Sequence, residues 1–93
     1  MPPDFKQKLY SILQQITDRA TAKKVERAYD LFHSSPARSN ADVRPSEQQI
    51  ISEIERLGSV VSQNETEQIV SIADNIFRLA EERNRQLKSA FIC

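Results

Sequence analysis

The sequence predicts an all-α protein, a small antiparallel four-helix bundle in up-down-up-down order. Its 93 residues contain one glycine and no Asn-Gly or Asp-Gly pair, so the tight turns that β-hairpins need are missing. Helix-forming residues such as Ala, Leu, Glu, Gln, Lys and Arg dominate instead. A chain of this length makes one domain, residues 1–93, with a thin core.

The first helix is expected to begin at Asp4, because its carboxylate can cap free backbone N–H groups and Pro2 and Pro3 precede it. An apolar stripe at steps of three and four residues follows. Its members are Phe5, Leu9, Ile12, Leu13 and Ile16.

A second stripe follows with no Gly or Pro between the two. At about 100° per residue, the two stripes point in nearly opposite directions, so one straight helix could not bury both. A break near residues 17–21 is therefore predicted, with Thr17, Asp18 or Thr21 capping the second helix. The second stripe comprises Ala22, Val25, Ala28, Tyr29 and Phe32.

Residues 34–45 are predicted to be a flexible linker between the second and third helices. The segment contains Pro36 and Pro45, and Val43 is its one sizeable apolar side chain. Such a composition buries too little surface to offset the entropy of ordering. We expect this mobile loop to be exposed.

The third helix is expected to open at Pro45 or Ser46, with Glu47 in its first turn. Gly58, the one glycine, is placed where a helix would end in a left-handed residue, with a short extra turn after it. The last helix is expected to begin at Asn64 with Glu67 completing a capping box. The two stripes comprise Ile50, Ile54, Leu57 and Val61, then Ile69, Ile72, Ala73, Ile76, Phe77, Leu79 and Ala80.

The C-terminal segment 81–93 is polar until its last four residues. Between Glu81 and Lys88 only Leu87 is apolar, which indicates a helix that does not rest on a core of its own subunit. Arg83, Arg85 and Lys88 are taken as a solvated face. Two interpretations stay open: a frayed or folded-back terminus, or a projecting helix end that presents an apolar tip to a second copy or a partner.

The net charge is zero, which argues against broad electrostatic capture of nucleic acid or an anionic membrane. The charge is uneven along the chain, however. Residues 1–45 carry eight basic and five acidic side chains, and residues 46–93 carry five and eight. This pattern fits helices that attract each other inside one bundle, or head-to-tail self-association.

No catalytic, cofactor or metal site is predicted, and we expect the protein not to be an enzyme. His33 is the one histidine and lies at a helix end beside Ser34 and Ser35, where attack geometry is poor. His33 and Cys93 are sixty residues apart and do not make a metal-ligand set. The apolar runs are too short for a membrane span, so an intracellular, cytoplasmic protein is expected.

The leading hypothesis is a non-enzymatic helical protein-protein interaction module: an adaptor, regulator or antagonist that offers an apolar helix face to another protein or, as a homodimer, to a second copy. No small-molecule substrate is inferred. The predicted partner-binding residues are Tyr10, Leu31, Leu87, Phe91 and Ile92.

The alternative is a small nucleic-acid-associated regulator that uses the basic face of the second helix. Four basic side chains lie within about two turns there, although Glu26 and Asp30 interrupt them. A salt-bridged, solvated face is the competing explanation. The four are Arg19, Lys23, Lys24 and Arg27.

Overall fold

The protein is a bundle of four helices, as the sequence predicts. A computed structural model describes residues 3–35, 41–63 and 65–92. Within these ranges all regular structure is helical. The helices are α1 (Pro3–Leu13), α2 (Arg19–Ser34), α3 (Arg44–Ser62) and α4 (Thr66–Ile92).

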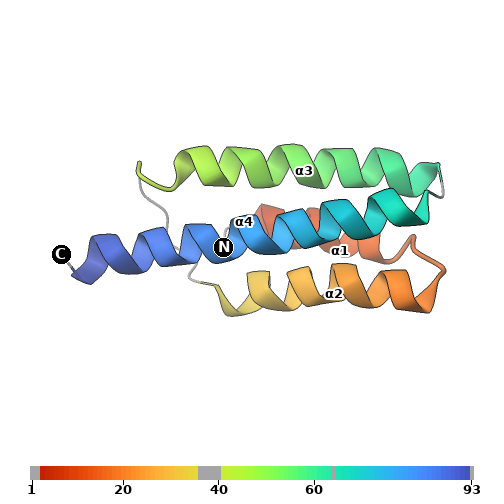
Figure 1. The fold of residues 1–93 in the computed structure, drawn as a ribbon, viewed down its shortest axis with the longest axis horizontal. Helices are drawn as coiled ribbons and strands as arrows, with labels where there is room; N and C mark the ends of the chain where they lie inside the picture. The colour runs from red at the N-terminus through yellow and green to blue at the C-terminus, as the bar shows by residue number, and fades with distance from the viewer. Residues whose placement is uncertain (1–2, 36–40, 64, 93) are drawn as a thin grey trace.

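Successive helices run in opposite directions along a rod of about 44 × 20 × 20 Å (Figure 1). α1 packs against α2 and α3, and α4 packs against the same two helices. α2 and α3 therefore occupy opposite corners of the bundle. α2 ends and α3 begins at the end of the bundle where α4 extends past α2 (Figure 1).

The break between α1 and α2 is where the opposed stripes place it. Asp18 is the N-cap of α2, and its Oδ2 accepts hydrogen bonds from the Thr21 backbone N–H at 3.0 Å and from the Thr21 hydroxyl at 2.5 Å. These two bonds, the hydroxyl bond first, lower the pKa of the Asp18 carboxyl below its usual value of 3.8. The cap lets both helices turn their apolar stripes to one core.

The core is built from the stripes of all four helices. Half-buried side chains such as Ile12, Ile16 and Phe77 pack around it. Removing this apolar surface from water supplies the main driving force for folding. The buried members are Phe5, Leu9, Val25, Ala28, Phe32, Ile50, Ile54, Leu57, Val60, Val61, Ile69, Ile72, Ala73, Ile76 and Ala80.

The expectation that Gly58 ends the third helix is wrong. α3 continues through Gly58 to Ser62. A Cβ built on Gly58 would lie 3.5 Å from Ile12 Cδ1 on α1, an ordinary van der Waals distance. The packing of α3 on α1 and α4 keeps this residue helical and overrides its local preference.

The predicted linker is partly ordered at both of its ends. Ser35 is half-buried and caps α2, and Val43, expected to be exposed, is fully buried just before α3 begins at Arg44. Residues 36–40 lie outside the described residues, as does Asn64, on which the predicted capping box rests. The described ends of the connection thus belong to the folded structure.

Candidate functional site

Two charged residues occupy core positions at one end of the α3–α4 pair. Glu47 precedes Ile54 by seven residues and Val61 by fourteen. Arg83 follows Ile76 by seven and Ile69 by fourteen. Because seven residues are nearly two helical turns, each charged side chain continues the buried stripe of its own helix.

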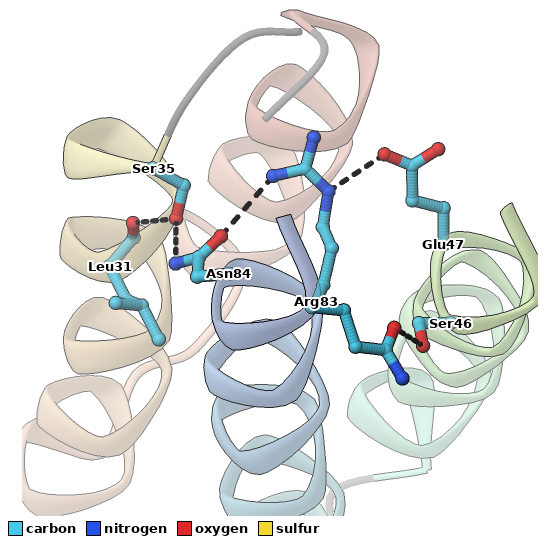
Figure 2. A network of polar contacts seen from close by, with 7 residues as sticks. Leu31, Ser35, Ser46, Glu47, Arg83 and Asn84 are labelled. Carbon is cyan, nitrogen blue, oxygen red and sulfur yellow. Dashed lines mark hydrogen bonds and ion pairs between the residues drawn. The ribbon is translucent and has the colours of Figure 1, made fainter. Parts of the chain in front are cut away.

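Glu47 and Arg83 form a buried ion pair, shown in Figure 2. Arg83 Nε donates to Glu47 Oε2 at 2.7 Å, and the exposed fractions of the two side chains are 0% and 10%. The second Arg83 donor, Nη1, lies 3.2 Å from Asn84 Oδ1. Breaking such a pair from one side would leave an uncompensated charge in the interior.

Further hydrogen bonds connect this ion pair to the end of α2. Asn84 Nδ2 donates to Ser35 Oγ at 2.8 Å, and Ser35 Oγ donates to the Leu31 carbonyl at 2.5 Å (Figure 2). We call the set Leu31, Ser35, Glu47, Arg83 and Asn84 the polar relay. It joins α2, α4 and α3 at the end of the bundle where the α2–α3 connection lies.

The interpretation of the C-terminal segment as a helix without support from its own subunit is therefore wrong for residues 83–87. Arg83 is buried and paired rather than solvated, and Leu87 is 3% exposed. Gln86 accepts a hydrogen bond from the Ser46 hydroxyl at 3.1 Å. Arg85 does lie on a solvated face, paired with exposed Glu82, whereas Arg83 and Gln86 bond to residues of α3.

A groove runs along the surface between α3 and α4. It consists of two adjoining hollows, of about 380 and 680 Å³, that share Glu53, Asn75 and Arg78. The other lining residues are Pro45, Gln48, Gln49, Ser52, Arg56, Gln68, Ser71, Ile72, Asp74 and Leu79.

The groove is suited to polar contacts. Its amide side chains can donate and accept at once, as the backbone of a bound polypeptide requires. Arg78 donates to the neutral Asn75 Oδ1 at 2.7 Å, whereas Arg56 lies 3.7 Å from the Glu53 carboxylate. The charge of Arg78 thus remains available for a carboxylate from outside.

The basic face of α2 is exposed. Arg19, Lys23, Lys24 and Arg27 are all exposed, and none pairs with a carboxylate among the described residues. Arg27 instead lies over the Phe77 ring of α4, 4.2 Å from its centroid. The face is thus solvated, as the competing explanation expects, but the ion pairs which that explanation also expects are not formed within the described residues.

The predicted partner-binding residues Tyr10, Leu31 and Leu87, whose side chains the structure describes, do not form one exposed surface. Tyr10 is 47% exposed and its ring lies 5.5 Å from that of Tyr29. Leu31, expected on the outside, packs against the core, and Leu87 is buried. Phe91 and Ile92 belong to the last turn of α4, and their side chains lie outside the described part.

Nothing in the sequence alone located the groove, because it depends on how two helices pack. The signal for the ion pair was present: Arg83 and Glu47 keep the seven-residue spacing of the stripes. Exposed His33 neither lines the groove nor takes part in the Glu47–Arg83 ion pair. In the described ranges no group of three or more His, Cys, Asp or Glu side chains could hold a metal ion.

No helix in the described part is both long and apolar enough to cross a membrane. Comparisons with protein-family models, with curated proteins and with solved structures find no significant match to this chain.

Proposed function

We propose that this protein is a non-enzymatic interaction module that binds a polypeptide segment of another protein in the α3–α4 groove. The observation that carries the proposal is the continuity of the groove: two hollows join at Glu53, Asn75 and Arg78. A bound segment would satisfy its backbone on the amide side chains and place a carboxylate on Arg78. Such a module acts as an adaptor, regulator or antagonist.

The test is affinity capture from the lysate of the native cell, read by mass spectrometry, with two variants of the same helix. Arg78→Glu reverses a charge inside the groove. Arg85→Glu makes the same change at an exposed residue outside it, which also bonds to the residue three positions earlier, Glu82, at 3.0 Å. We expect one dominant protein that Arg85→Glu retains and Arg78→Glu loses.

One result would contradict the groove as the binding site. Capture that Arg78→Glu leaves intact would place the contact elsewhere, with exposed Tyr10 as the next residue to substitute. Size-exclusion chromatography with light scattering adds a second outcome, which concerns the occupant of the groove. A dimer that Arg78→Glu dissociates would make a second copy the occupant.

The second candidate function is phosphate binding by the basic face of α2, which is favoured by four exposed cations that form no ion pair within the described residues. Lys23→Glu with Lys24→Glu should weaken nucleic-acid binding and flatten its dependence on salt. The matched control is Arg56→Glu with Arg85→Glu, which changes the net charge equally on α3 and α4. Equal losses from both pairs would show a general charge effect, and an unchanged salt slope would exclude the basic face.

A further inference from the structure

The α1–α2 hairpin could dock on the α3–α4 hairpin in two ways. In one, α2 would lie beside α3, its neighbour in sequence. In the observed arrangement α2 lies beside α4 and α1 beside α3. Both keep every successive pair antiparallel. In the observed arrangement the neighbours α1 and α3, and α2 and α4, run in the same direction, whereas the alternative would place only antiparallel helices side by side. Helix direction therefore gives the observed arrangement no advantage.

The length of the α2–α3 connection does not choose either. It spans nine residues, Ser35 to Val43, which could reach about 30 Å when extended. Neighbouring helix axes are about 10 Å apart, and diagonal corners about 14 Å. Both arrangements are within reach.

The apolar side chains of the core distinguish only weakly between the two arrangements. The buried stripes of α3 and α4 are mostly Ile, Leu and Val, such as Ile50, Ile54, Ile72 and Ile76. Branched aliphatic side chains of similar volume accept several partners at modest cost. Directional contacts discriminate better, because a buried donor or acceptor without its partner is costly.

The polar relay supplies such directional contacts. Glu47 holds the Arg83 guanidinium through Nε, and Arg83 Nη1 holds the Asn84 carbonyl oxygen. The Asn84 amide nitrogen is thereby turned toward α2, where it donates to Ser35 Oγ. Ser35 and Asn84 are both half-buried, so if α2 lay beside α3, the Asn84 amide would lose this acceptor where it is only partly open to water.

We propose that the polar relay selects the arrangement in which α2 lies beside α4, and that its residues serve this selection more than stability. Buried polar groups that specify one packing among several are known in helical assemblies. The Glu47–Arg83 pair lies within one hairpin and orients the relay. The Asn84–Ser35 hydrogen bond forms only when α2 lies beside α4, and so favours that arrangement.

The experiment uses a disulfide reporter far from the relay, in a chain with Cys93→Ser. Ile12→Cys with Gly58→Cys places two thiols at the α1–α3 contact, where the Gly58 Cβ position lies 3.8 Å from Ile12 Cγ1. Ile12 Cγ1 marks where the sulfur of Ile12→Cys can lie, and the sulfur of Gly58→Cys is one bond from that Cβ position, so the two sulfurs are within reach of each other. If α2 lay beside α3, α1 and α3 would be diagonal and the thiols too far apart. The effective concentration of the two thiols in a glutathione buffer measures the population of the observed arrangement.

Ser35→Ala with Asn84→Ala removes the arm to α2. We expect it to lower this effective concentration at least about twofold, as the second arrangement becomes populated. The matched control, Ser46→Ala with Gln86→Ala, removes a hydrogen bond at the same end that lies within the α3–α4 hairpin, and should leave it unchanged.

An unchanged effective concentration in the first pair, or an equal fall in the control, would overturn the proposal. If the first pair loses its helical circular dichroism, Glu47→Leu with Arg83→Met replaces it. That pair keeps buried volume while removing the orientation of Asn84. It should lower the effective concentration too, and a value equal to that of the parent chain would overturn the proposal.

Discussion

At the end of the bundle where α3 turns into α4, Val61 and Ile69 are buried members of the apolar core. Fourteen residues away along each helix, the equivalent positions hold Glu47 and Arg83. The first layer needs only shape and volume, whereas the second needs a partner of opposite charge in a fixed orientation. We call the end with Val61 and Ile69 the tolerant end, because it needs only apolar side chains of suitable volume. We call the end with Glu47 and Arg83 the demanding end, because each side chain there needs a particular partner.

The largest expected loss of stability comes from a substitution at the demanding end. Arg83→Met removes the cation that balances the buried Glu47 carboxylate and should lower the free energy of unfolding by about 3 to 5 kcal/mol. Urea denaturation followed by circular dichroism measures this loss. A loss below about 1 kcal/mol, typical of exposed pairs, would show that the pair is hydrated in solution.

The same measurement at the tolerant end should give a smaller loss. Ile69→Ala deletes buried apolar atoms in the last layer and should cost about 2 to 3 kcal/mol, partly through the cavity it leaves. Ile69→Val should cost about 1 kcal/mol. If Ile69→Ala proved as costly as Arg83→Met, the contrast between the two ends would fail.

How far the sequence predicts this contrast depends on whether the deciding contacts are local. The break at Asp18 was predicted because two apolar stripes of one chain segment disagree in phase, and the cap lies within three residues. Arg83 was assigned to solvent because the partner that buries it is thirty-six residues away. Its spacing from Ile76 was visible, but spacing alone does not show that a charge is paired.

Two further differences between the sequence predictions and the structure also arise from contacts between residues far apart in the sequence. Gly58 ends no helix because contacts from α1 and α4 outweigh its own preference. Val43 is buried just before α3 begins, although exposed Asp42 and Arg44 flank it, so no local pattern encodes its burial. The α3–α4 groove likewise exists only once both helices are packed.

A substitution at the contact between α1 and α3 is expected to stabilise the protein. Gly58→Ala should raise the free energy of unfolding by about 0.5 to 1 kcal/mol, because alanine favours the helix and its methyl group would only touch Ile12. Thermal unfolding should show a higher midpoint. A lower midpoint would mean that α1 packs more closely on α3 than these distances show.

The smallest expected effect concerns pH at the exposed N-cap of α2. Because the folded-state pKa of Asp18 is lowered below 3.8, its carboxylate stabilises the fold above that pH. This contribution is lost as the pH falls through the folded-state pKa. Asp18→Asn keeps a side-chain acceptor but does not titrate, so its stability difference from the parent chain should shrink below about pH 3.8. A difference constant with pH would contradict the assignment, which a carbon NMR titration of Asp18 checks directly.

The Tyr10–Tyr29 contact makes the chain its own optical reporter. The sequence has no tryptophan and two tyrosines, and their rings are 5.5 Å apart at the α1–α2 contact. Intrinsic fluorescence therefore records the separation of α1 from α2, while circular dichroism records the melting of every helix. Unfolding curves that coincide would show that the demanding end and the α1–α2 hairpin melt as one cooperative unit, without any dye or label being attached.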